Sequence, residues 1–240
     1  MSGVPMAIAG DALMTLAPHA QLGVSPPAAP VRARVAGRAA AGNGERVGYE
    51  TAKRVMDGVL AGLGLLAAAP LMLAVGVWIQ VVDPGPVFYK QARVGRDGWL
   101  FWVWKLRTMS VRAESGGARF AEAHDPRVLR GMRWVRKSHV DELPQLVNIL
   151  RGEMSLVGPR PERPELHEAM RRKLPGMERR LAVKPGLTGL AQVVNGYTND
   201  LAGMRRKLAL DLRYVRRRGV WTDVRLLWAT APKLWDRGAC

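Results

Sequence analysis

An uncharged and almost wholly apolar run from Gly58 to Val82 constrains the fold of this chain more than any other feature. A straight helix over this run would measure about 37 Å at ~1.5 Å per residue, enough to cross a hydrocarbon core of about 30 Å. Pro70 lies in the middle of the run, where proline removes a backbone donor and bends or breaks a helix. Length therefore allows a membrane span, but the proline argues against a straight one.

Basic residues flank this run on both sides, and positive charge beside membrane segments favours the cytoplasmic face. They are Arg46, Lys53 and Arg54 before the run and Lys90, Arg93, Arg96, Lys105 and Arg107 after it. We therefore favour a re-entrant helix hairpin over residues 46–84, kinked at Pro70, that enters and leaves through the same face. A true span is the first alternative. A buried core helix is the least favoured, because the helix surface is apolar all round.

The N-terminal segment and the charge balance set further limits. Residues 1–45 are rich in Ala, Pro and Gly and have no periodic apolar face, so we predict a disordered tail. The formal net charge is +17, which requires an anionic partner such as nucleic acid, anionic lipid or a phosphorylated substrate. Cys240 is the only cysteine, so the fold does not depend on an internal disulfide or an oxidising compartment.

The C-terminal segment Leu201–Trp235 mixes Leu, Val and Trp with many Arg residues. Trp221, Trp228 and Trp235 follow one another at intervals that place them on one stripe of a helix. Basic helices with Trp and Leu on one face lie in the headgroup plane of a membrane. An ordinary amphipathic helix with its Trp side chains in a soluble core is the alternative. The neighbouring membrane segment favours the interfacial interpretation.

The remaining segments indicate an α+β fold that is mainly helical. Pro86–Met109 has short runs rich in β formers on either side of the turn Gly95–Gly98 and predicts a β-hairpin or small sheet. Asp125–Ser138 predicts a short basic helix, because Asp125 suits an N-cap and proline follows it. We expect one catalytic domain over residues 85–240, with the membrane hairpin before it and interfacial amphipathic helices at its C-terminal end.

Two adjacent carboxylates, Asp141 and Glu142, lie at the start of another predicted helix. On local physics alone they are an N-cap and an acidic first turn, which favours the helix dipole. Two loops stiffened by Gly and Pro follow, one presenting Arg160 and the other presenting Lys184. Basic loops beside an acidic pair and a membrane segment indicate a pocket for phosphate esters near a bilayer.

These motifs together resemble those of the bacterial sugar transferase family, the monotopic polyprenyl-phosphate phosphoglycosyl transferases. The resemblance runs from about Lys53 to Trp235, and its motifs occur in the family's order. The matching segments are Lys105–Met109, Asp141–Leu146, Met154–Pro161 and Lys184–Gly189.

The resemblance implies a reaction in which a nucleotide-diphosphate sugar gives its sugar phosphate to a polyprenyl (undecaprenyl) phosphate and releases a nucleoside monophosphate. It implies Asp141 as the nucleophile that carries the sugar phosphate, and Mg²⁺ as the cofactor with Glu142 as a ligand. The covalent route suits the chemistry, since two anions repel and splitting the transfer makes each step easier. A divalent ion neutralises the pyrophosphate and takes few protein ligands.

Four basic residues match basic positions in the family's motifs, and the resemblance implies that they hold phosphates or neighbouring loops. They are Lys105, Arg107, Arg136 and Arg160. Structural ion pairs with Glu153, Glu162 or Glu165 are the alternative. Asp211 also matches a recurrent acid, and we expect a structural role for it.

The chain departs from the family pattern at three places. His139 stands where serine is usual, two residues before Asp141, and Ala69 replaces a small hydroxyl residue before Pro70. An arginine that many members carry after Gln192 is absent, and the sequence near Tyr197 differs. That phosphate contact cannot be transferred to this chain.

The resemblance also implies partners and a location. We expect membrane lipids and the two substrates as partners, no nucleic acid, and a homodimer as an open alternative. The expected location is the cytoplasmic face of the bacterial inner membrane, at the start of exopolysaccharide or other glycan assembly. A membrane-anchored module that only binds anions is the competing hypothesis, and a scaffold in a glycan-assembly complex is a third. The binding module does not account for an acidic pair among basic loops, since binding anions would be better served without the pair.

Overall fold

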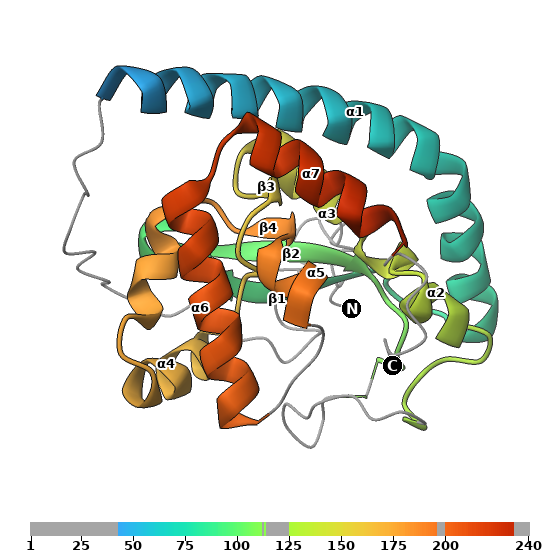
Figure 1. Cartoon of the computed structure of the whole chain (residues 1–240). Helices are drawn as coiled ribbons and strands as arrows, with labels where there is room; N and C mark the ends of the chain where they lie inside the picture. Colours follow the sequence, from blue (N-terminus) through green and yellow to red (C-terminus); the bar gives the residue numbers. More distant parts are fainter. Residues whose placement is uncertain (1–42, 112, 114–124, 196–199, 233–240) are drawn as a thin grey trace, which may run out of the picture.

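The computed structural model describes residues 43–111, 113, 125–195 and 200–232. Helix α1 (Asn43–Val82) is one continuous element that contains Pro70, and Figure 1 shows it bending as it passes over the rest of the molecule. A proline inside a helix removes one backbone hydrogen bond and accounts for a bend. The apolar run therefore forms a single bent helix, and the predicted tail lies almost entirely outside the described residues.

Most of the apolar surface of α1 faces away from the protein. The segment Val47–Val82 is long and apolar enough to cross a membrane, and only 11% of its most apolar window is buried. Ala61, Val75 and Ile79 contact the core, whereas Leu66 and Leu73 are about three-quarters exposed, at 75% and 71%. The alternative of a buried core helix is therefore wrong. A helix that exposes so much apolar surface suggests membrane association.

The predicted β-hairpin is present. Strand β1 (Phe88–Val94) pairs antiparallel with β2 (Leu100–Leu106), with Phe88 opposite Leu106 and Val94 opposite Leu100. The connection Gly95–Gly98 contains a 3₁₀ turn in which Asp97 has a φ of 56°. Phe101 and Val103 of β2 share one face and are buried in the core, whereas β1 is buried only at Val94.

The predicted helix over Asp125–Ser138 is much shorter than expected. Only Arg133–Lys137 forms a helix, α2, while Val128 instead makes an isolated antiparallel bridge with Met109. Asp125 does not cap a helix: its carboxylate accepts a hydrogen bond from the backbone N–H of Arg127 at 3.0 Å. An Asp side chain that bonds its own backbone two residues on stabilises a turn, and this contact defeats the N-cap interpretation.

A second small sheet links the two stiff loops. Helix α3 (Gln145–Arg151) leads into β3 (Ser155–Val157), which pairs in parallel with β4 (Gly186–Thr188). The backbones of these two segments approach so closely that a Cβ on Gly186 would lie 2.0 Å from the backbone nitrogen of Gly158. Only glycine fits there. The loops that follow β3 and precede β4 are therefore held side by side.

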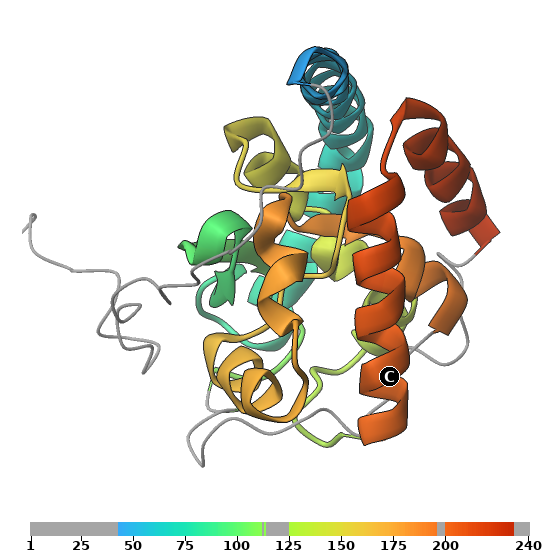
Figure 2. The same cartoon turned by 60° about the vertical axis from the view of Figure 1, so that its left-hand side comes forward.

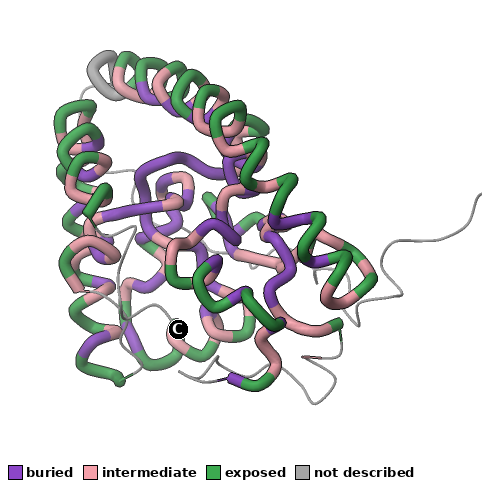
Figure 3. Tube along the Cα trace, turned by 90° about the vertical axis from the view of Figure 1, so that its right-hand side faces the viewer, coloured by how far each residue is buried: buried purple, intermediate pink, exposed green. Residues whose placement is uncertain are grey.

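The C-terminal half is helical. Helix α4 (Pro164–Lys173) is followed by α5 (Leu190–Asn195), α6 (Leu201–Arg217) and α7 (Val220–Thr230). Figure 2 shows α1 and α7 along the same upper side of the molecule, and Figure 3 shows the buried chain concentrated beneath α1. The main core joins residues of α1, β2, α3 and β3, among them Ala61, Val103, Ile149 and Leu156.

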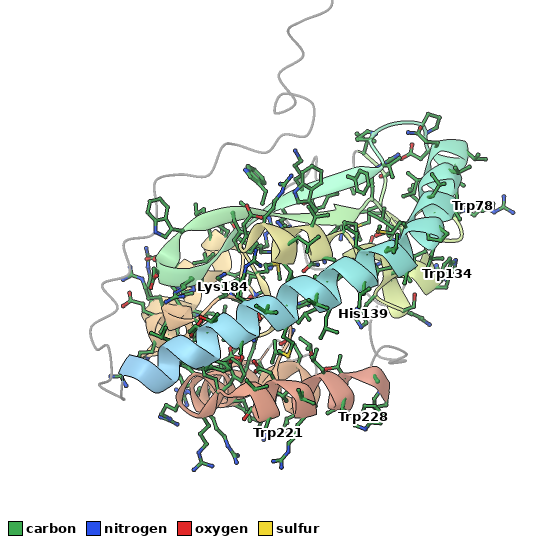
Figure 4. All side chains as sticks on the ribbon, turned by 90° about the horizontal axis from the view of Figure 1, so that it is seen from above. Trp78, Trp134, His139, Lys184, Trp221 and Trp228 are labelled. Atoms are coloured by element: carbon green, nitrogen blue, oxygen red, sulfur yellow. The ribbon has the colours of Figure 1, made fainter. Side chains whose placement is uncertain are left out.

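The tryptophans of α7 do not enter that core. Trp221 and Trp228 are 77% and 84% exposed, and Figure 4, which looks down on α1 and α7, shows both on α7. Trp235 lies outside the described residues. The alternative in which these side chains pack into a soluble core is therefore wrong for the two that the structure describes. Exposed Trp beside basic residues is typical of a helix at a membrane interface.

Candidate active site

The acidic pair lies in a 3₁₀ turn, Val140–Glu142, immediately before α3. His139 precedes the turn with a φ of 55°, and its carbonyl accepts a hydrogen bond from the backbone N–H of Glu142 at 3.0 Å. Pro144, not Asp141, occupies the cap position of α3, and no side chain caps that helix. The simple N-cap interpretation of Asp141 is therefore wrong, and its carboxylate is available for another purpose.

Glu142 is buried and bound by two cations from different loops. The ammonium of Lys105, on β2, lies 2.7 Å from Oε1. Arg160 binds both oxygens, with Nη2 2.5 Å from Oε1 and Nη1 3.1 Å from Oε2. Such two-point contacts between guanidinium and carboxylate are strong and fix orientation. The structure thus brings three predicted site residues together.

Asp141 is equally buried but differs from Glu142 in its contacts. Among the residues that the structure describes, no hydrogen bond or ion pair engages its carboxylate. Burial raises the pKa of Asp141, and the charge of Glu142 raises it further, against the opposing charges of Lys105, Arg136 and His139. An unpaired carboxylate in a buried site is poorly solvated and therefore more nucleophilic than one in water.

The pKa of Glu142 shifts in the opposite direction. Burial acts to raise it, but Arg160 and Lys105 together hold the pKa of Glu142 well below its usual range. Two adjacent carboxylates whose environments separate their pKa values have different chemical roles. The basic partners of Glu142 favour its ionised form, whereas burial disfavours the ionised form of Asp141.

Arg136 and Arg107 occupy different surroundings. Arg136 lies near Asp141, where its charge lowers the pKa of that carboxyl, and its Nη1 donates to the Thr108 hydroxyl at 3.3 Å. Arg107 is buried at the end of α1, where it pairs with Asp83 and its Nε donates to the Pro86 carbonyl at 2.6 Å. This contact ties the hairpin to α1. A phosphate-binding role for Arg107 stays a prediction.

A buried ion network that the sequence did not reveal supports Arg160. The Nη2 of Arg180 donates to the carbonyl of Arg160 and binds the carboxylate of Asp211, each at 2.7 Å. Arg180 also reaches Glu162 at 3.4 Å, and Lys207 pairs with the same Glu162. The structural role expected for Asp211 is confirmed. Its motif match was the one sequence signal for this network.

The comparison with known families settles the lineage. The protein-family model described as "Bacterial sugar transferase" matches residues 48–237, which include the whole site. The chain belongs to the bacterial sugar transferase family. The resemblance read from the motifs around Asp141 is confirmed.

Named relatives within this family are moderately similar in sequence. The chain is 40% identical over 191 residues to the UDP-glucose:undecaprenyl-phosphate glucose-1-phosphate transferase of Caulobacter vibrioides, covering 79% of this chain and 72% of that protein. It is 41% identical over 182 residues to a UDP-N-acetylgalactosamine-undecaprenyl-phosphate N-acetylgalactosaminephosphotransferase of Aeromonas hydrophila, covering 76% and 43%. The Escherichia coli UDP-glucose enzyme is 39% identical over 184 residues, covering 75% and 39%.

The chain thus spans less than half the length of two of these three relatives, and about seven-tenths of the third. Their printed substrates also differ, with UDP-glucose named in two and UDP-N-acetylgalactosamine in the other. Membership in the family therefore does not specify the sugar. The departure near Tyr197 lies outside the described residues, just beyond Asn195 at the end of α5.

The donor set at the acidic pair suits a hard divalent cation. Asp141 and Glu142 offer carboxylate oxygens, and no group of three or more His, Cys, Asp or Glu in the described part of the chain forms a richer metal site. Mg²⁺ binds through one or two carboxylates while keeping waters and substrate oxygens, so two carboxylates fit. Glu142 would share its carboxylate with Arg160 and Lys105, whereas Asp141 presents oxygens that its described neighbours leave unbonded.

Proposed function

We propose that this chain transfers a sugar 1-phosphate from a nucleotide-diphosphate sugar to a polyprenyl phosphate through an aspartyl-phosphosugar intermediate at Asp141. The observation that carries the proposal is the contrast within the acidic pair. Glu142 is fixed by Lys105 and Arg160, while the neighbouring Asp141 carboxylate is buried and free of described partners. The named activities of the relatives support the same reaction class.

The first step forms one bond and breaks one. A carboxylate oxygen of Asp141 attacks the β-phosphorus of the donor, and the bond from that phosphorus to the oxygen bridging the two phosphates breaks. The nucleoside monophosphate leaves with the bond's electron pair. Asp141 must be ionised to attack, which is consistent with a site where Lys105 and Arg136 counter the effect of burial on its pKa.

The second step restores the enzyme. A phosphate oxygen of the polyprenyl phosphate attacks the acyl phosphate, and the bond between the Asp141 oxygen and phosphorus breaks. The product is a polyprenyl diphosphate sugar, and Asp141 is again a carboxylate. Both steps bring anions together, so basic groups at the site lower the barrier. The ammonium of Lys105 has three donors, and Glu142 takes one of them.

The cofactor that we propose is Mg²⁺, held by Glu142 together with Asp141 and substrate oxygens. When bound, it would neutralise pyrophosphate charge and help the nucleoside monophosphate to leave. The role of this chain is to supply the two carboxylates and to hold Glu142 in place through Lys105 and Arg160.

We propose a monotopic placement in the bacterial inner membrane, with the catalytic domain on the cytoplasmic face. The bend of α1 (Figure 1) is what a helix that enters and leaves a membrane through one face requires, and basic residues lie on both flanks. The exposed Trp221 and Trp228 of α7 would sit at headgroup depth. This placement brings a lipid-linked acceptor to a soluble donor, as initiation of exopolysaccharide or other glycan assembly requires.

The proposal is tested by incubating the full chain with a panel of nucleotide-diphosphate sugars, polyprenyl phosphate and Mg²⁺. We expect release of nucleoside monophosphate with one or a few donors. An Asp141→Asn variant should remain bound to membranes and release none. Full activity in that variant would remove Asp141 from the mechanism. Membrane binding without release from any donor by the unaltered chain would instead favour the anion-binding module.

A further inference from the structure

A basic hollow lies near the C-terminal end of α3, whereas the acidic pair lies just before the N-terminal end of this helix. The hollow is lined by the N-terminal part of α1, by the loop before β4 and by the end of α6. The lining includes Arg54, Lys184, Tyr214 and Arg218. Asp141 precedes α3 and Gly152 follows it, so about 10 Å of helix separates the two regions.

Most of the charged groups in this hollow are already paired. Lys53 binds Asp223 at 2.7 Å, and Arg218 lies 3.5 Å from Glu50. Asp57 accepts a hydrogen bond from the backbone N–H of Leu156 at 3.0 Å. Asp223 and Glu50 are therefore paired with cations, whereas Asp57 accepts only a backbone hydrogen bond. The charges of Asp57 and Glu50 partly offset those of the remaining cations.

Arg54 and Lys184 are those remaining cations. Arg54 donates to the carbonyls of Ile149 and Leu150, each at 2.7 Å, at the C-terminal end of α3. Lys184 has no hydrogen bond or ion pair to any residue that the structure describes. Burial lowers the pKa of Lys184, and the charges of Arg54 and Arg96 lower it further, against the opposing charges of Asp57 and Glu50.

The two cations lie next to each other. Both approach Gly152: a Cβ built on this glycine would be 3.5 Å from Nζ of Lys184 and 3.6 Å from Cζ of Arg54. Like charges held this close repel each other, and an anion between them would remove the repulsion. Pro185 and the pairing of β4 with β3 fix the backbone that carries Lys184, so the arrangement is preorganised.

The location of the hollow indicates which anion it receives. Its α1 residues, from Glu50 to Asp57, come directly before the apolar run that starts at Gly58. Figure 4 shows Lys184 close to this N-terminal part of α1. A basic site at the start of a membrane-embedded segment lies at the depth of the lipid headgroups. The phosphate of a headgroup therefore reaches it more readily than a soluble anion does.

We propose that Arg54 and Lys184 form a subsite for the phosphate group of an anionic phospholipid, separate from the transfer site. The subsite rests on the proposed membrane placement of α1 but not on the transfer reaction. A bound headgroup phosphate neutralises the Arg54–Lys184 pair and fixes the start of α1 to the loop before β4. Arg54 uses the side of its guanidinium that does not face the α3 carbonyls, and Lys184 supplies the second contact.

The test is native mass spectrometry of the full chain in detergent with equal amounts of phosphatidylglycerol and phosphatidylcholine. We expect the unaltered chain to retain phosphatidylglycerol preferentially. Lys184→Gln should lower that retention at least tenfold, and Lys184→Arg should keep it. Lys173→Gln is the matched control, because it removes one charge from the exposed end of α4 and should change nothing. Equal retention of both lipids by the unaltered chain, or full retention by Lys184→Gln, would overturn the subsite.

Two further measurements distinguish a lipid phosphate from a free anion, and the subsite from the transfer reaction. If inorganic phosphate at millimolar concentration displaces no phosphatidylglycerol, the lipid subsite is supported. If phosphate alone protects the chain from thermal unfolding, and Lys184→Gln loses that protection, the site binds a free anion and the lipid assignment is overturned. Asp141→Asn should retain phosphatidylglycerol as the unaltered chain does. Failure of the transfer reaction therefore leaves the subsite standing, and failure of the subsite leaves the reaction standing. Circular dichroism confirms that Lys184→Gln is folded.

Discussion

Arg160 binds both carboxylate oxygens of Glu142, with Nη2 2.5 Å from Oε1 and Nη1 3.1 Å from Oε2. Replacing Arg160 by Lys keeps the charge but removes the planar two-point contact. A hydrogen bond to a charged group is worth about 1.5–3 kcal/mol, so we expect kcat/KM for sugar-phosphate transfer to fall about tenfold to a hundredfold. Steady-state release of nucleoside monophosphate measures this loss.

The matched control is Arg172→Lys, the same change at an exposed residue that pairs with Glu168 across one turn of α4. Its kcat/KM should equal that of the unaltered chain, since exposed pairs contribute little. Equal activity of Arg160→Lys and Arg172→Lys would show that the geometry at Glu142 does not matter to the reaction.

The opposite pKa shifts of the acidic pair predict the pH dependence of activity. Asp141 must be ionised to attack, and its pKa is raised by burial. Activity should therefore be present above the raised pKa and lost as pH falls through it, at a higher pH than an ordinary aspartate of about 3.9 would give. Glu142 stays ionised over this range because its pKa is lowered.

The measurement is the pH profile of kcat/KM, with His139→Asn as a control. His139 is another ionisable side chain close to Asp141, and asparagine tolerates its left-handed backbone. The acid limb should persist in this variant. An acid limb whose pKa is at or below that of free aspartate would contradict the assignment of this limb to Asp141. Loss of the limb in His139→Asn would contradict it as well.

Lys105 and Arg107 lie two residues apart but should respond differently to substitution. Lys105→Ala removes a cation from Glu142, so we expect a large loss of kcat with little change in the unfolding midpoint. Arg107→Ala leaves Asp83 and the Pro86 carbonyl without their donor, which costs about 1–3 kcal/mol of unfolding free energy. Thermal unfolding and nucleoside monophosphate release, measured on both variants, separate the two. A normal midpoint with lost activity in Arg107→Ala would support its predicted phosphate-binding role.

These two residues also show where sequence reasoning succeeds and where it stops. Two runs of β formers around the Gly95–Gly98 turn were sufficient to predict the hairpin, because that pattern is local. The choice of partner for each cation is not local. Arg107 meets Asp83 only because the end of α1 returns beside β2, and no spacing in the sequence indicates that contact.

The same limit explains the other differences. The family resemblance led to the acidic pair and to Arg160, but not to Arg180, whose contacts with Asp211 and with the Arg160 carbonyl come from distant segments. The helix expected from Asp125 gave way to a turn because the Asp125 side chain bonds the Arg127 backbone and Val128 pairs with Met109. Tertiary pairing overrode a local capping signal.

The re-entrant placement of α1 predicts which positions a water-soluble reagent can reach. In a Cys240→Ser background, we expect Val47→Cys and Trp99→Cys, both exposed positions on either side of α1's apolar run, to be labelled by a maleimide from the cytoplasmic side. Leu66→Cys is the control: it is exposed in the protein but should be shielded by lipid. Labelling of Val47→Cys and Trp99→Cys from opposite sides would establish a span.

The most direct test of the central claim is the mass of the protein after reaction with donor alone. With its nucleotide sugar and Mg²⁺ but no polyprenyl phosphate, the full chain should gain the mass of one sugar phosphate, on the peptide that contains Asp141. Added polyprenyl phosphate should remove the adduct, and Asp141→Asn should never form it. Turnover without any adduct on rapid quenching, or an adduct on another residue, would contradict Asp141 as the nucleophile.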